Sequence, residues 1–112
     1  MFFVFCVYRI YFFRYNAYSK NTAGETKKMY KIAVCDDEEK ILEKTKRLIR
    51  EWNPEVEVRG FSSGKELMEN YEPYEAIFLD IDMPGMNGIE TGKAIRRIDK
   101  GTKIVYLTAY RD

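Results

Sequence analysis

The sequence contains no histidine among its 112 residues, and this absence excludes several kinds of chemistry. Ser-His-Asp triads, metal sites with imidazole ligands and histidine phosphocarriers all require this residue. Cysteine is scarce as well, since only Cys6 and Cys35 occur and their spacing matches no disulfide framework. So little cysteine is typical of the reducing cytoplasm, which is the location we predict. Carboxylates are therefore the residues best able to carry chemistry.

The sequence also lacks an uninterrupted apolar run long enough to cross a membrane. The aromatic stretch Met1–Phe13 is broken by Arg9 and falls short of the roughly 20 apolar residues that a spanning helix needs. It does not resemble a secretory signal, because no basic segment precedes it and no small-residue cleavage site follows. We predict no transmembrane segment, and we interpret residues 1–28 as an apolar and basic N-terminal extension outside the native domain. A membrane-surface anchor, a partner-binding segment and an extra strand over Val4–Phe13 stay open as alternatives.

An excess of basic charge is missing from the rest of the chain. Residues 1–28 hold five Lys or Arg against one acid, whereas residues 29–112 hold fourteen against seventeen. We see no basic stripe and no helix with Arg or Lys clustered on one face, which nucleic-acid binders usually show. The charge distribution therefore predicts no direct nucleic-acid binding by this segment.

Short apolar runs alternate with segments of helical period from Tyr30 onward, and this alternation is typical of an α/β fold around a parallel sheet. Ser63 with Glu66, and Asn87 with Glu90, have the spacing of helix N-terminal caps. The strands are expected at 30–35, 55–59, 75–79 and 103–108, and the helices at 38–52, shortly after residue 63 and at 87–98.

Two local features complete this prediction. Gly60 is expected to turn the chain after the second strand. The first helix should pack through one apolar stripe, because its apolar residues recur at helical spacing. The stripe comprises Ile41, Leu42, Thr45, Leu48, Ile49 and Trp52.

Acidic residues follow two of the predicted strands. Asp36 and Asp37 come after the first strand, Asp80 comes after the third, and Thr108 ends the fourth. In an open parallel sheet these carboxyl ends share one edge, where ligands bind. Carboxylates gathered there repel one another unless a cation neutralises them, and hard oxygen ligands suit Mg²⁺. Separately, each residue has an ordinary interpretation as a helix-start acid, a turn residue or a strand-end hydroxyl; together they predict one site.

Three motifs carry a resemblance to a known family: IAVCDDE at 32–38, LDIDMPGMNGIE at 79–90 and IVYLTAY at 104–110. Together they resemble the CheY-like receiver domains of response regulators in two-component signalling, over residues 30–112. The cysteine before the acids and the LTAY strand are similar to the LytTR-type subgroup of transcriptional regulators. The resemblance implies a flavodoxin-like three-layer fold with a parallel sheet in the strand order 2-1-3-4-5. Four of those five strands are expected in this chain.

The resemblance also implies a role for each site residue. Asp80 would be the phosphoacceptor, and a partner sensor histidine kinase would supply the phosphoryl group, so the domain is a signalling module and not an enzyme. Mg²⁺ would be held by Asp80 itself, by Asp37 directly, by Asp36 through water and by the backbone carbonyl of Asp82. Thr108 would hydrogen-bond the phosphoryl group. The acceptor loop would be shaped by Pro84 and Gly88, with Ala109 leaving room for the phosphate.

The sequence departs from the family pattern after its fourth strand. Family members continue with a helix, a strand carrying a phosphate-pairing Lys, and a last helix, so we interpret residues 29–112 as a receiver domain lacking that portion. Lys103 cannot replace the missing Lys, because it precedes the fourth strand and lies at the opposite end of the sheet from Asp80. The fourth strand is expected to be an exposed apolar edge, open to self-association or covered by the Val4–Phe13 segment.

Two other functions compete with phosphoacceptance. Haloacid-dehalogenase-type phosphatases also place D-x-D after an apolar strand, as Asp80 and Asp82 do here, but that family gives no reason for acids after the first strand. The second alternative is an interaction module that no longer takes phosphate.

Overall fold

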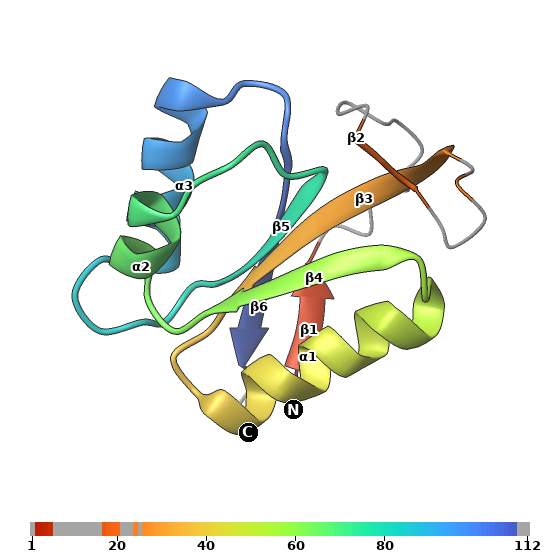
Figure 1. The fold of residues 1–112 in the computed structure, drawn as a ribbon. Coiled ribbons are helices and arrows are strands. Elements are labelled where there is room, and N and C mark those ends of the chain that lie inside the picture. Colours follow the sequence, from red (N-terminus) through yellow and green to blue (C-terminus); the bar gives the residue numbers. More distant parts are fainter. Residues whose placement is uncertain (1, 6–16, 21–23, 25, 110–112) are drawn as a thin grey trace.

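The structure, a computed structural model, describes residues 2–5, 17–20, 24 and 26–109. Its centre is a parallel sheet of four strands: β3 (Thr26–Cys35), β4 (Val56–Phe61), β5 (Ala76–Asp80) and β6 (Lys103–Ala109). The spatial order is β4-β3-β5-β6, which is the first part of the order 2-1-3-4-5 expected from the sequence (Figure 1). The α/β, flavodoxin-like fold class with four parallel strands is thus confirmed.

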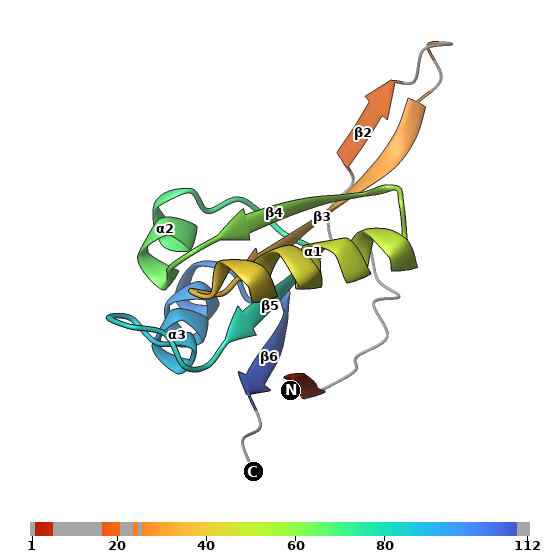
Figure 2. The ribbon, with the colours of Figure 1, turned by 90° about the horizontal axis from the view of Figure 1, so that it is seen from below.

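Helices cover both faces of this sheet and make three layers. Helix α1 (Glu39–Trp52) packs on one face, where Leu42 and Ile49 join Ile32 and Val34 of β3 in a buried cluster. The opposite face is covered by α2 (Gly64–Glu69) and α3 (Gly88–Ile98), as Figure 2 shows from below. The core on that face contains Ala33, Cys35, Phe61, Leu67, Tyr74, Ile77, Leu79, Met83 and Ile95.

The predicted helix caps are present. Ser63 Oγ accepts a hydrogen bond from the backbone N–H of Glu66 at 3.1 Å, and Asn87 Oδ1 accepts one from the N–H of Glu90 at 2.9 Å. Each cap satisfies a backbone donor that the first helical turn leaves without a partner. The cap at Asn87 therefore fixes where α3 begins, just after the loop that follows Asp80.

Two local predictions are wrong. Gly60 does not turn the chain, because β4 continues through it to Phe61. The apolar stripe of α1 is also narrower than expected: Leu48 and Trp52 are 52% and 61% exposed. Helix α1 is the only described helix on its face of the sheet, so just one side of the stripe finds a packing partner.

The N-terminal strands pair with β6 and with the start of β3. Strand β1 (Phe2–Phe5) pairs antiparallel with β6 over Tyr106–Ala109, so this part of the edge that was expected to be exposed is covered. Among the residues that the structure describes, no strand pairs with the outer edge of Lys103–Val105. Of the segment considered as an alternative cover, Val4 and Phe5 belong to β1, and residues 6–13 lie outside the described residues. Strand β2 (Ala17–Lys20) pairs with the start of β3, which therefore begins four residues before the expected Tyr30. The resulting two-stranded arm projects from the body (Figure 2).

Within the described residues, no helix is long and apolar enough to span a membrane.

Candidate phosphoacceptor site

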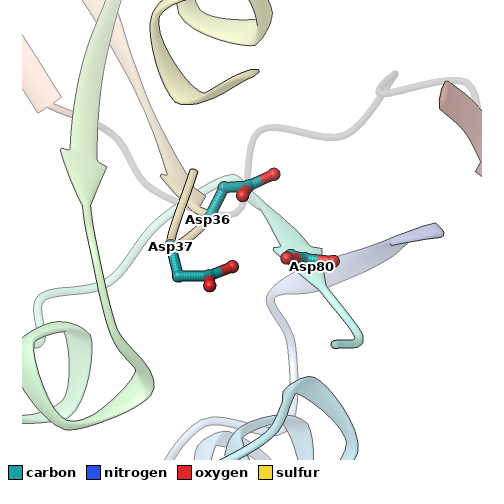
Figure 3. Close-up of side chains that lie close together, drawn as sticks. All are labelled: Asp36, Asp37 and Asp80. Carbon is teal, nitrogen blue, oxygen red and sulfur yellow. The ribbon is translucent and has the colours of Figure 1, made fainter. Parts of the chain in front are cut away.

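Three carboxylates from two strand ends meet at one edge of the sheet. Asp36 and Asp37 follow β3 directly, and Asp80 is the last residue of β5. One carboxylate oxygen from each of the three lies within 4.8 Å of the others. Figure 3 shows the three side chains converging on the same space. The juxtaposition predicted from the sequence is therefore present.

Backbone contacts fix Asp36 in position. Its N–H donates to the carbonyl of Phe61 at 3.0 Å, which ties the end of β3 to the end of β4. Its Oδ1 accepts from the N–H of Glu38 at 2.9 Å, next to the start of α1. Asp36 is only 1% exposed, and its Oδ2 has no hydrogen-bond partner among the described residues. A buried carboxylate oxygen without a partner is costly, and this one needs a donor or a cation.

Asp80 is held equally firmly. Its Oδ1 accepts the backbone N–H of Asp82 at 3.2 Å. The next residue, Ile81, donates its N–H to the carbonyl of Leu107 in β6, and its own carbonyl accepts from the N–H of Gly88. The acceptor loop is therefore hydrogen-bonded to the sheet on one side and to the start of α3 on the other. A Cβ at Gly88 would overlap the carbonyl oxygen of Asp80, which explains why glycine is needed there.

Burial and mutual repulsion make the ionised form of these carboxylates unfavourable. Burial, followed by the nearby charge of Asp36, raises the pKa of Asp80 to about 7. Burial also raises the pKa of Asp36, with the hydrogen bond from Glu38 opposing the shift. Among the described residues, no Lys or Arg lies within 4.0 Å of any of the three carboxylates. A divalent cation would remove both the repulsion and the desolvation cost, so the donor set fits one.

The other predicted site residues are only partly placed. Thr108 is half-buried and follows Leu107, the residue of β6 that stands opposite Asp80, so it lies at the same edge. Lys103 pairs in register with Ala76 at the far end of β5 and is remote from Asp80, as expected. Asp82 and Pro84 are exposed in the acceptor loop.

One contributor was missed by the sequence reading. Met83, in the acceptor loop, is 7% exposed and sits in the core, a burial that the sequence analysis does not predict. Its sulfur lies 3.6 Å from the thiol of Cys35, beneath the acids that follow β3. Burial raises the pKa of that thiol to about 12. The sequence alone does not single out Met83, because the same loop also contains the apolar residues Ile81 and Met86.

Comparison with known proteins agrees with this geometry. The family model "Response regulator receiver domain" matches residues 32–112. The chain therefore belongs to the response-regulator receiver family, and the phosphatase family considered as an alternative is not supported.

Particular relatives narrow this assignment. The chain is 37% identical over 83 residues to the sensory transduction protein LytT of Oceanobacillus iheyensis, covering 70% of this chain and 34% of that protein. This similarity agrees with the LytTR-type subgroup expected from the sequence. The chain spans about a third of the length of the curated relatives it matches.

Two solved structures resemble the fold. One is response regulator TrrA of Thermotoga maritima in complex with Mg²⁺-BeF, with a TM-score of 0.63, 35% identity, and coverage of 68% of this chain and 66% of that one. The other is histidine kinase ThkA in complex with TrrA, with a TM-score of 0.66, 36% identity, and coverage of 75% and 72%. The chain is thus a receiver domain of a two-component response regulator.

Proposed function

We propose that this domain accepts a phosphoryl group on Asp80 from the phosphohistidine of a sensor histidine kinase, with Mg²⁺ bound beside it. The convergence of the carboxylates of Asp36, Asp37 and Asp80 within 4.8 Å carries the proposal. The complex of a receiver with a histidine kinase among the similar structures supports the class of donor. The cytoplasmic location expected from the sequence belongs to the same proposal.

The metal would be held by the carboxylates of Asp37 and Asp80, by Asp36 through water, and by the backbone carbonyl of Asp82. The unpartnered Oδ2 of Asp36 and the raised pKa of Asp80 support such a site, because both features lose their energetic cost beside a cation. The similar structure solved with Mg²⁺-BeF supports the choice of metal. When bound, Mg²⁺ would neutralise the charge that builds up between the acceptor carboxylate and the incoming phosphoryl group.

The chain's own residues would do the rest. A carboxylate oxygen of Asp80 attacks phosphorus, forming an O–P bond while the P–N bond to the kinase histidine breaks, and the released imidazole keeps the electron pair. The N–H of Asp82 holds the other carboxylate oxygen, which orients the attacking one. Thr108, at the end of β6, would donate its hydroxyl to a phosphoryl oxygen. Phosphorylation would then shift the domain between two conformations that bind the phosphoryl group differently.

Beryllofluoride, which mimics the acyl phosphate, tests the proposal directly. Titration of the full chain with Mg²⁺ and beryllofluoride should give saturable binding, followed by the fluorescence of Trp52 or by NMR of backbone amides. Asp80→Asn should abolish this binding, whereas Glu39→Gln, an exposed acid in the first turn of α1, should leave it unchanged. Thr108→Ala should weaken it. Absence of binding by the unchanged chain would instead support the interaction module that takes no phosphate.

A further inference from the structure

The segments that follow β3, β4 and β5 form an acidic edge of the domain. We define the acidic edge as residues 36–40, 62–66 and 80–90. The three strands end level, because Cys35 pairs in register with Phe61 of β4 and with Leu79 of β5. The segments therefore leave the sheet on the side where the three carboxylates of the candidate site meet (Figure 3).

Charge is divided unevenly between the acidic edge and the rest of the domain. The edge holds eight acids against two lysines, Lys40 and Lys65, which gives a net charge of −6. Residues 29–112 together hold seventeen acids and fourteen basic residues, so the remainder has nine acids and twelve basic residues, a net charge of +3. The negative charge of the domain is thus concentrated around Asp80.

The acids of this edge also lack the partners that other acids of the domain have. Away from the edge, five glutamates lie within 4.0 Å of a Lys or Arg nitrogen: Glu43, Glu51, Glu57, Glu69 and Glu72. Among the described residues, no carboxylate of the acidic edge has such a neighbour. Lys65, one of the two cations of the edge, pairs at 3.8 Å with Glu69, which lies outside it. The charge of the edge is therefore not neutralised by ion pairs within the described part of the domain.

Helix stabilisation and the proposed metal explain only part of this charge. Glu39 and Glu90 lie in the first turns of α1 and α3, where negative charge interacts favourably with the helix dipole. Glu38 makes no capping hydrogen bond, and the exposed side chain of Asp82 serves neither a helix nor the metal. A bound divalent cation would still leave the edge with a net charge of −4.

This excess charge acts on any donor that approaches Asp80. A small phosphodonor in solution, such as acetyl phosphate, is an anion and is repelled within about 10 Å at 0.1 M salt. A protein surface of opposite charge is instead attracted and oriented, which raises its association rate about tenfold or more. Any protein that brings a phosphoryl group to Asp80 must cover the acidic edge, so the sign of its charge there affects the encounter.

We propose that the acidic edge selects the phosphodonor by charge, disfavouring small anionic donors and attracting a donor protein whose surface around its phosphohistidine is basic. This inference rests on the proposed function and adds the chemistry of the partner surface to it. In the transfer itself, the O–P bond to Asp80 forms as the P–N bond to the donor histidine breaks, with the electron pair left on the imidazole. The acidic edge affects the encounter that precedes this step.

Two phosphohistidine peptides of equal length test the proposal on the full chain. One peptide carries Lys on both sides of the phosphohistidine, the other carries Ser, and acetyl phosphate serves as the small anionic donor. With Mg²⁺ in excess, the phosphorylated fraction is followed by mass spectrometry of the intact chain at low salt and at about 0.5 M salt. At low salt the Lys peptide should transfer about tenfold faster than the Ser peptide, and at high salt less than about threefold faster. Acetyl phosphate should react faster at high salt than at low salt.

Matched variants locate the effect. Glu38→Gln with Glu90→Gln removes two charges from the acidic edge and no proposed ligand of Mg²⁺. This pair should reduce the advantage of the Lys peptide at low salt more than about twofold, and it should speed the reaction with acetyl phosphate. Glu43→Gln with Glu51→Gln removes two charges from exposed positions of α1 away from the edge, and it should change either rate less than about 1.5-fold.

The possible failures are distinguishable. Equal rates from the two peptides at low salt, equal effects of the two variant pairs, or phosphorylation by acetyl phosphate alone would overturn the inference while phosphoacceptance by Asp80 stands. If no donor phosphorylates the chain and beryllofluoride does not bind, the proposed function fails and the inference fails with it.

Discussion

Removal of one charge from the acidic cluster should stabilise the metal-free domain. The pKa of Asp80 is raised from 3.8 to about 7, mainly by burial and then by the charge of Asp36. A carboxyl group with a raised pKa binds its proton more tightly in the folded state than in the unfolded state. Its contribution to folding is therefore fully present below about pH 4 and is lost as the pH rises through about 7. Three pKa units correspond to about 4 kcal/mol, and side-chain relaxation lowers this to about 2–4 kcal/mol.

Asp80→Asn removes this charge while keeping an oxygen that can accept from Asp82. At pH 8 in EDTA we expect a melting temperature about 10 °C above that of the unchanged chain, measured by circular dichroism. The difference should shrink toward pH 5, and Mg²⁺ should raise the melting temperature of the unchanged chain far more than that of the variant. Glu39→Gln serves as a control and should change neither value. If Asp80→Asn is no more stable than the unchanged chain at pH 8 in EDTA, the repulsion inferred from the geometry is absent.

Three further predictions concern the framework of the site. Gly88→Ala should cost about 1–3 kcal/mol in urea unfolding, because the new methyl group overlaps the carbonyl of Asp80; an unchanged midpoint would contradict the close packing. Asn87→Ala should cost about 1 kcal/mol through loss of the α3 cap, with Asn87→Ser largely restoring it in the same assay. In a Cys6→Ser background, Cys35 should resist iodoacetamide at pH 8 and react only after denaturation, because burial raises the pKa of its thiol to about 12; rapid labelling of the native chain would refute this.

The sequence predicted the sheet well because its strands are short apolar runs with clear boundaries. The limits of β5 and β6 lie within one residue of the expected ones. Gly60 was misjudged because a glycine can lie within an edge strand as readily as in a turn. The pairing of β1 with β6 was open from sequence, since β-propensity does not specify a partner strand.

The sequence predicted which residues form the site, but not the backbone hydrogen bonds that hold them in place. Asp36 and Asp80 come together because parallel strands end at one edge, a rule that requires no coordinates. The contacts that hold them are backbone groups, such as the carbonyl of Phe61 that binds the N–H of Asp36, and any residue type could supply these. The expectation that no helix clusters basic side chains on one face was wrong, because the exposed residues Lys93, Arg96 and Arg97 have the spacing of one face of α3.

The support also explains why a cluster that repels itself can serve as a site. Asp36 is tied to β4 through Phe61, and Asp80 is tied to β6 and α3 through Ile81, so separating the carboxylates would break hydrogen bonds of the sheet. The packing of the domain therefore keeps the carboxylates close together although they repel one another. Binding of a cation removes this repulsion, and little entropy is lost because the ligands are already in place. The same acids on a looser loop would bind the cation more weakly. Weakening the support without touching a carboxylate, as Gly88→Ala does, should thus lower Mg²⁺ affinity as well as stability. Equal Mg²⁺ affinity in that variant and in the unchanged chain would show that the acids assemble around the metal without help from the fold.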